Sequence, residues 1–215
     1  DADTSAWLEA FESDEKIDKE FVEAWAKLEK SANTDGLPWS DLKALDEVLK
    51  STPENARIHL SNSTSARYVQ MVDTSESKRI HCNRGVAGID GCTSTAVGNA
   101  LNLEATVVLI SGDVAFQYDL NGLATIDEVP GNLRIVVINN GGGEIFRWLE
   151  GPESLGLVDK YFETKPRTSA KSAAEYCGLN YFCARNQEET QKAMDEMMQN
   201  NAASILEVVT DGLKS

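Results

Sequence analysis

The sequence predicts an α/β fold: a doubly wound parallel sheet of about six strands flanked by helices, with a helical N-terminal lead-in. Two apolar runs of strand length, Thr106–Ser111 and Leu133–Asn139, show no polar alternation, which is typical of central parallel strands covered on both faces. Strand-like and helix-like segments alternate from about residue 57 onward. A chain of 215 residues, 41% of them hydrophobic, can bury one such core without disulfides.

The N-terminal part of the chain is predicted to be helical. In residues 1–35 apolar side chains recur at near-helical spacing, namely Phe11, Ile17, Phe21, Trp25 and Leu28. After a turn over 33–38, Ser40 can cap a helix through Leu42–Leu49 that ends near 52–55. We expect residues 1–50 to be the tail of a preceding domain with its linker, and residues 51–215 to form the sheet domain.

The remaining elements follow in alternation. Besides the two apolar runs, the predicted strands are 57–61, 79–83, 181–184 and 203–209. The predicted helices are 63–72, 92–103, 169–178 and 187–200. A short helix is also expected directly after Gly112-Asp113.

Charge and cysteine content exclude several classes of function. The formal net charge of −15 opposes binding to nucleic acid or to an anionic membrane. No apolar run approaches the ~20 residues of a membrane span, and no signal-peptide pattern is present, so we expect no membrane insertion and a cytoplasmic location. The cysteines at 82, 92, 177 and 183 form no C-x-x-C pair and complete no zinc set with His59 and His81, so buried free thiols are expected.

Polar and glycine residues directly follow the two central strands. Gly112-Asp113 ends the first, and Asn139-Asn140-Gly141-Gly142-Gly143 ends the second. Parallel strands carry ligands beyond their carboxyl ends, and a right-handed crossover makes these strands neighbours, so Asp113 and Asn140 should lie close together. One carboxylate, one amide and glycine-exposed carbonyls suit Mg²⁺ shared with a diphosphate. The helix start after Asp113 would offer N–H groups to a phosphate. The competing interpretation is a helix cap and a turn without a ligand.

The same residues resemble the diphosphate-binding signature of thiamine-diphosphate enzymes. That signature usually begins Gly-Asp-Gly, and Val114 stands in place of the third residue here. Three further stretches resemble one family among them, the 2-succinyl-5-enolpyruvyl-6-hydroxy-3-cyclohexene-1-carboxylate synthases of menaquinone biosynthesis: Asn83–Gly91 (NRGVAGIDG), Tyr118–Asn121 (YDLN) and Asn139–Phe146 (NNGGGEIF). The resemblance is specific over about residues 55–150 and implies a thiamine-diphosphate-binding fold.

The resemblance implies roles for individual residues. Asp113, Asn140 and the Gly142 carbonyl would ligate Mg²⁺ (or Mn²⁺), and Ile89 would hold the cofactor bent. The other implied cofactor-binding residues are Asn62, Ser63, Gly112, Val114, Ala115 and Ile145. The implied substrate-binding residues are Ser63, Arg67, Arg84 and Phe146. Two arginines suit dicarboxylate substrates, because guanidinium groups bind carboxylates bidentately. Either arginine could instead be a surface or turn residue. Nothing in the sequence orients His81 for catalysis.

The implied reaction is decarboxylation of 2-oxoglutarate, followed by addition of the succinic semialdehyde–thiamine carbanion to isochorismate. The family's activating glutamate lies in a pyrimidine-binding domain of a partner subunit, so no catalytic residue is expected within this chain. Because the chain begins with Asp1 and has room for one α/β domain, we expect the C-terminal part of a longer homo-oligomeric synthase (a dimer or tetramer), inactive alone. The alternatives are another thiamine-diphosphate decarboxylase or acetohydroxyacid-type synthase, a phosphate- or nucleotide-binding module without chemistry, and a structural domain.

Overall fold

The computed structural model describes residues 18–28, 34–72, 78–148, 151, 154 and 156–212. It divides into two compact units, Asp1–Ser31 and Ala32–Ser215. The first contains helix α2 (Lys19–Leu28), as predicted, where Phe21 and Trp25 meet edge to face at 6.2 Å between ring centroids. The rest of the helix predicted over 1–35 lies largely outside the described residues.

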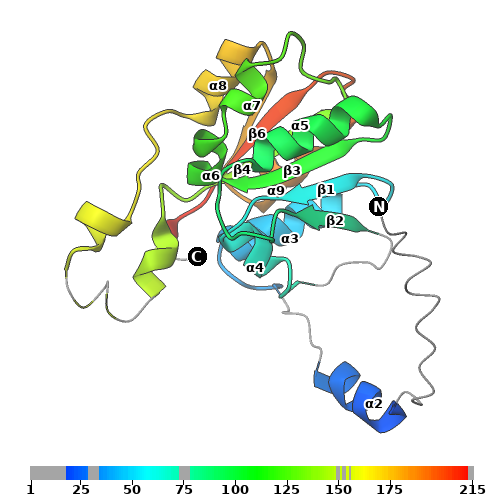
Figure 1. The fold of residues 1–215 in the computed structure, drawn as a ribbon, viewed down its shortest axis with the longest axis vertical. Helices are drawn as coiled ribbons and strands as arrows, with labels where there is room; N and C mark the ends of the chain where they lie inside the picture. Colours follow the sequence, from blue (N-terminus) through cyan, green and yellow to red (C-terminus); the bar gives the residue numbers. More distant parts are fainter. Residues whose placement is uncertain are drawn as a thin grey trace, which may run out of the picture. The chain divides into compact units, whose positions relative to one another are not determined.

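The second unit is built on a six-stranded sheet whose paired strands are all parallel, in the order β2-β1-β3-β4-β6-β5 (Figure 1). The strands are β1 (Arg57–Leu60), β2 (Arg79–Cys82), β3 (Val107–Gly112), β4 (Leu133–Asn139), β5 (Asn180–Ala184) and β6 (Ser204–Val209). Each lies within one residue of its predicted bounds. The fold class and the number of strands are therefore confirmed.

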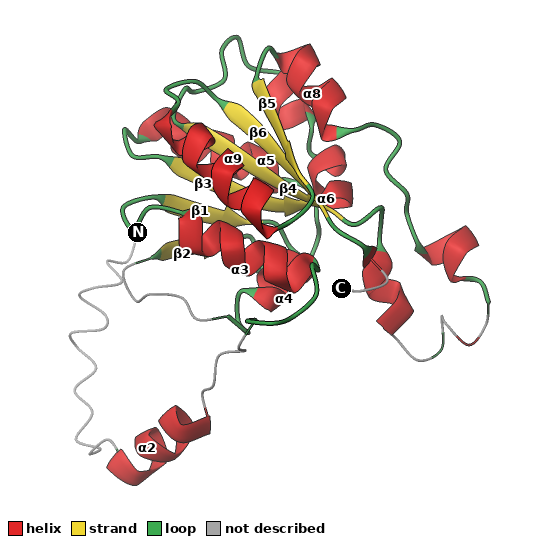
Figure 2. Ribbon diagram, turned by 180° about the vertical axis from the view of Figure 1, so that it is seen from behind, coloured by secondary structure: helices red, strands yellow, loops and turns green. Residues whose placement is uncertain are grey.

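Helices cover both faces of the sheet. One face carries α3 (Asp41–Ser51), α4 (Thr64–Tyr68) and α9 (Gln187–Gln199), which lie in front of the strands in Figure 2. The opposite face carries α5 (Cys92–Asn102), α6 (Asp113–Tyr118), α7 (Asn121–Ala124) and α8 (Ala170–Cys177). Two further segments, a 3-10 turn at Glu144–Trp148 and a π-helical turn at Val158–Phe162, follow β4.

The two cores explain the apolar runs of the sequence. On β4, Val136 and Ile138 pack toward α3 and α9, whereas Ile135 and Val137 pack toward α5 and α8. Successive side chains of a strand point to opposite faces, so a strand between two helical layers needs apolar residues at every position.

Helix α3 belongs to the sheet unit. Its residues Ala44, Leu45, Val48 and Leu49 are buried in the same core as β1, β3 and β4, and the predicted cap Ser40 accepts a hydrogen bond from the Lys43 N–H. The compact unit thus begins at Ala32 rather than at residue 51. The reason is that α3 buries its apolar face on this sheet instead of leading away from it.

Two smaller expectations are corrected. Helix α4 ends at Tyr68 instead of reaching residue 72. The four cysteines are free, but only Cys92 is buried, whereas Cys82 and Cys177 are half-buried and Cys183 is exposed. In the part of the chain that the structure describes, no helix combines the length and apolar character needed to cross a bilayer.

Candidate functional site: a cavity at the carboxyl end of the sheet

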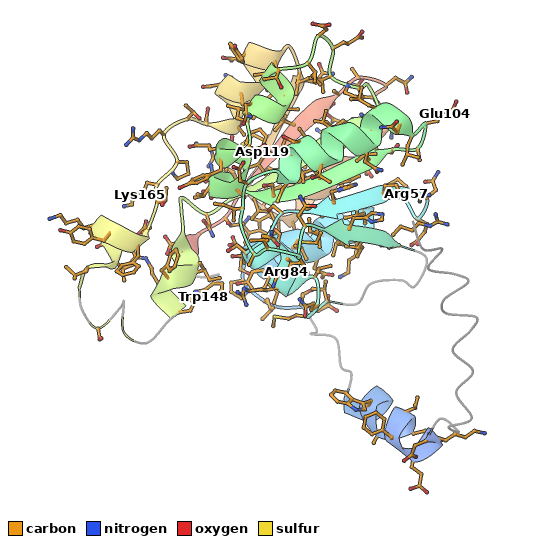
Figure 3. All side chains as sticks on the ribbon, viewed as in Figure 1. Arg57, Arg84, Glu104, Asp119, Trp148 and Lys165 are labelled. Atoms are coloured by element: carbon orange, nitrogen blue, oxygen red, sulfur yellow. The ribbon has the colours of Figure 1, made fainter. Side chains whose placement is uncertain are left out.

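The carboxyl ends of the strands open into a cavity of about 630 Å³. All thirteen residues that the sequence assigned to cofactor, substrate or metal line this cavity: Asn62, Ser63, Arg67, Arg84, Ile89, Gly112, Asp113, Val114, Ala115, Asn140, Gly142, Ile145 and Phe146. Figure 3 shows Arg84 and Trp148, which both line it, at this end of the sheet, and Arg57 and Glu104 at the opposite end. Residues spread over 85 positions of the sequence (62–146) therefore meet at one place.

The neighbouring strands β3 and β4 bring the two central motifs together. Gly112 pairs with Ile138, so Asp113, which follows β3, and Asn139, the last residue of β4, lie side by side. Asp113 is 6% exposed. Its Oδ1 accepts from the Val114 N–H at 2.7 Å, and its Oδ2 accepts from the Gly141 N–H at 3.0 Å. The predicted proximity of the Gly-Asp and Asn-Asn motifs is thus found as a direct hydrogen bond.

Burial dominates the chemistry of Asp113. It raises the pKa of this carboxyl group from 3.8 to about 7, against the hydrogen bonds from backbone N–H groups, which lower it. The negative charge of Asp41 raises the pKa of Asp113 further. A buried carboxylate of this kind is stabilised by a cation beside it.

The turn after β4 is held by its own asparagines. The Gly141 N–H is shared between Asp113 and Asn139 Oδ1, and the Gly142 N–H donates to Asn140 Oδ1 at 3.2 Å. Glycine is required at Gly142, where φ is +150° and an added Cβ would lie 2.6 Å from the Thr164 carbonyl oxygen. The Gly143 N–H donates to that same carbonyl at 3.0 Å, which fastens the turn to the far wall of the cavity.

The donor set fits a magnesium ion better than a metal held by protein alone. Within the described residues, no group of three or more His, Cys, Asp or Glu side chains is placed to hold a metal. At the ends of β3 and β4 the cavity offers the buried carboxylate of Asp113, with the Asn140 amide and a glycine-rich turn beside it. Mg²⁺ accepts such a set, because it takes one or two carboxylates and completes its shell with phosphate oxygens and water.

Asn62 uses its polar atoms on the protein. Its amide nitrogen donates to the carbonyls of Asn83, Val86 and Gly88, and its oxygen accepts from Arg84 Nη1 at 3.3 Å. The loop that carries Arg84 and Ile89 is therefore fixed by the end of β1. The resemblance implied a cofactor-binding role for Asn62, and in the structure its amide atoms bond to this loop while the residue lines the cavity.

Ser63 and the two arginines complete this side of the cavity. Ser63 has φ +73° and ψ −129°, which is strained backbone for a residue with a Cβ, and its hydroxyl does not cap α4. Arg67 and Arg84 are exposed at the cavity. Neither forms an ion pair with a carboxylate of the described chain, so both can receive the carboxylates of a ligand.

We expected the start of the helix after Asp113 to offer N–H groups to a phosphate, but the Val114 N–H there donates to the Asp113 carboxylate. Helix α6 is also only six residues long. Its dipole therefore adds less attraction for an anion than a long helix would.

The cavity also contains residues that the sequence did not predict for the site, among them Asp41, Leu45, Tyr68, Trp148, Phe162 and Thr164. The first two lie on α3, which was assigned to a preceding domain. Phe162 and Thr164 lie in an irregular segment after β4 that has no periodic pattern. An Arg147 cluster holds that segment: its guanidinium pairs with Glu144, Asp159 and the buried Glu163.

The comparisons with known proteins agree with this geometry. The chain matches the family described as "Thiamine pyrophosphate enzyme, C-terminal TPP binding domain" over residues 62–208. It therefore belongs to the thiamine-diphosphate (thiamine pyrophosphate) enzymes, as their C-terminal cofactor-binding domain. The fold is also that of a benzoylformate decarboxylase from Polynucleobacter necessarius, with a TM-score of 0.71 and 17% identity over 86% of this chain and 35% of that one.

More similar in sequence are curated 2-succinyl-5-enolpyruvyl-6-hydroxy-3-cyclohexene-1-carboxylate synthases. The protein of Christiangramia forsetii is 41% identical over 81% of this chain and 30% of its own length. That of Flavobacterium johnsoniae is 38% identical over 91% of this chain and 35% of its own. The chain thus spans about a third of the length of these relatives.

Proposed function

We propose that this chain supplies the magnesium- and diphosphate-binding half of the active site of a 2-succinyl-5-enolpyruvyl-6-hydroxy-3-cyclohexene-1-carboxylate synthase. The observation that carries the proposal is the buried carboxylate of Asp113, which faces the glycine turn after β4. The same cavity is lined by all thirteen predicted site residues. Asp113, Asn140 and the Gly142 carbonyl would hold Mg²⁺, with Mn²⁺ as a substitute. When bound, thiamine diphosphate supplies the decarboxylation and carbon–carbon bond chemistry.

The other residues of the chain bind and orient. Ile89, half-buried on the loop fixed by Asn62, offers an apolar surface against which the cofactor can bend. Ser63, Arg67 and Arg84 stand where substrate carboxylates could approach, and in a chain of net charge −15 the two arginines supply local positive charge. Phe146 and Ile145 form the apolar wall that limits access of water. The substrates we propose are therefore dicarboxylates, 2-oxoglutarate and isochorismate.

The first test is calorimetric titration of the chain with thiamine diphosphate, with and without Mg²⁺. We expect binding that requires Mg²⁺ in the wild-type chain and is lost in Asp113→Asn. The matched control is Asp119→Asn, because Asp119 is equally buried at 2% exposure, bonds to Ser94, and does not line the cavity. Binding unchanged in Asp113→Asn would refute the metal site, and a response to nucleotides in its place would favour a nucleotide-binding module.

Substrate choice distinguishes the proposal from another decarboxylase or acetohydroxyacid-type synthase. With the cofactor bound, 2-oxoglutarate should bind more tightly than pyruvate, and Arg84→Ala should remove most of that preference. Equal affinity for pyruvate and 2-oxoglutarate would favour the alternative.

We also propose that catalysis needs a glutamate from outside the described chain, contributed by a partner subunit of a homo-oligomer. The one glutamate that lines the cavity among the described residues, Glu144, pairs with Arg147 at 2.9 Å. A turnover assay on this chain alone should show no carboligation, and a normal rate would disprove the requirement.

A further inference from the structure

A second buried carboxylate lines the cavity. Asp41 is the first residue of α3 and is only 2% exposed. It lies outside the residues 62–208 that match the family, and no sequence motif pointed to it. A carboxylate is buried at this depth only when its oxygens are hydrogen-bonded or paired.

The bonds of Asp41 lead to the turn after β4. Its Oδ2 accepts from Asn140 Nδ2 at 2.6 Å, and its Oδ1 accepts from the Thr210 hydroxyl at the end of β6. The Thr210 N–H in turn donates to the Asn139 carbonyl at 2.9 Å. One side chain of α3 thus joins the ends of the neighbouring strands β4 and β6.

This contact fixes which end of the Asn140 amide faces the turn. An ionised carboxylate has no hydrogen to donate, so only the NH₂ group of the amide can bond to it. The amide oxygen must then point away from Asp41, and it is found accepting from the Gly142 N–H. Without Asp41 the amide could rotate by half a turn and present its NH₂ group, which repels a cation.

We propose that Asp41 is a positioning residue for the magnesium site: it holds the Asn140 amide with its oxygen toward the metal. The inference rests on the proposed function, since it assigns Asn140 as a ligand. Asp41 also adds a negative charge that acts on Asp113, and a divalent cation would offset both carboxylates. Residues behind a metal ligand typically change metal affinity by about 10–100-fold when removed.

The first experiment compares two aspartates of α3. Asp46 is also buried, at 4% exposure, but bonds to Thr34 and Lys50 and does not line the cavity. Mg²⁺ is titrated by calorimetry at saturating thiamine diphosphate into the wild-type chain, Asp41→Ala and Asp46→Ala. We expect the Mg²⁺ dissociation constant to rise about tenfold or more in Asp41→Ala and to stay within about twofold in Asp46→Ala, although both lose stability. A wild-type dissociation constant in Asp41→Ala overturns the proposal.

An exchange of the two side chains tests the hydrogen bond itself. Asn140→Asp sets two carboxylates against each other, so the metal-free chain should lose stability. Adding Asp41→Asn restores a donor facing an acceptor with the polarity reversed, and still leaves an oxygen for the Thr210 hydroxyl. In urea unfolding without Mg²⁺, the folding constant of the double variant should be at least about fivefold higher than that of Asn140→Asp, near the value of one recovered hydrogen bond. A double variant that is no more stable contradicts the hydrogen bond on which the positioning role rests.

A readout without cofactor separates this inference from the proposed function. In the NMR spectrum of the unliganded chain, the Asn140 side-chain NH₂ signal should exchange slowly with solvent, and this protection should vanish in Asp41→Ala. If the wild-type chain binds no Mg²⁺, the proposed function fails and the role of Asp41 fails with it. If the wild-type chain binds Mg²⁺ but Asp41→Ala binds it equally well, or if Asn140 shows no protection, only the positioning role is overturned.

Discussion

The stability of the metal-free chain should fall as the pH rises, because of Asp113. Burial raises the pKa of this carboxyl group from 3.8 to about 7 in the folded chain. Between these two values the unfolded chain has released the proton and the folded chain still holds it, so ionisation favours the unfolded state. The contribution of Asp113 to stability is therefore greatest below about pH 4, declines up to about pH 7 and is level above it.

The size of the effect follows from the same two values. At about 1.36 kcal/mol per pKa unit, the difference between 3.8 and about 7 corresponds to roughly 4 kcal/mol, of which about 3 kcal/mol falls between pH 5 and pH 8. The assay is urea unfolding at pH 5, 6, 7 and 8 in the presence of a chelator, on the wild-type chain and on Asp113→Asn. The variant cannot ionise at this position. Between pH 5 and pH 8 its free energy of unfolding should therefore fall by about 3 kcal/mol less than that of the wild-type chain.

Comparison of the two proteins removes other titrations from the result. Burial lowers the pKa of His59, which gives a pH dependence of opposite sign, but it is common to both chains and cancels in the difference. Mg²⁺ with thiamine diphosphate should restore wild-type stability at pH 8 and leave Asp113→Asn unchanged. Parallel pH profiles of the two proteins would refute the reasoning.

Two further predictions concern the walls of the cavity. Gly142→Ala should lower the free energy of unfolding by about 2 kcal/mol or more, because φ is +150° and the new Cβ would meet the Thr164 carbonyl. Thermal unfolding measures this loss. The control in the same experiment is Gly85→Ala, because there is open space around Gly85. Arg147→Ala leaves the buried Glu163 without its guanidinium partner, so amide hydrogen exchange over 143–164 should become faster by mass spectrometry. Unchanged exchange there would show that the cluster does not hold this wall.

The strand ends were the part of the site that the sequence could predict. Asp113 and Asn140 follow unmistakable central strands, and the rule for parallel sheets places the residues after such strands at one edge. Their direct connection through the Gly141 N–H follows from the pairing of Gly112 with Ile138. Local pattern and topology were sufficient for Asp113, Asn140 and the glycines beside them, whereas the other predicted cavity residues came from the family resemblance.

Tertiary packing decided what the sequence could not predict. Asp41 stands at the start of an amphipathic helix, and its pattern of apolar residues is the same whether that helix covers this sheet or a preceding domain. The polar atoms of Asn62 could equally have faced a ligand, and only the path of the loop over 83–91 shows that they bond to its carbonyls. Residues such as Phe162 lie in irregular backbone, for which periodicity carries no information.

The tie between α3 and the turn after β4 has a practical consequence for where the chain can be cut. Asn140 bonds to Asp41, 99 positions earlier, and Asp41 bonds to Thr210, 169 positions later. A shortened protein confined to the family-matched residues 62–208 would keep every residue that the sequence nominated for the cavity. It would lose both Asp41 and Thr210, and therefore the hydrogen bond that holds the Asn140 amide on the side of α3. Such a shortened domain would keep the sequence motifs. We nevertheless expect its cavity to bind ligands differently from that of the longer chain, which makes it unsuitable for ligand screening.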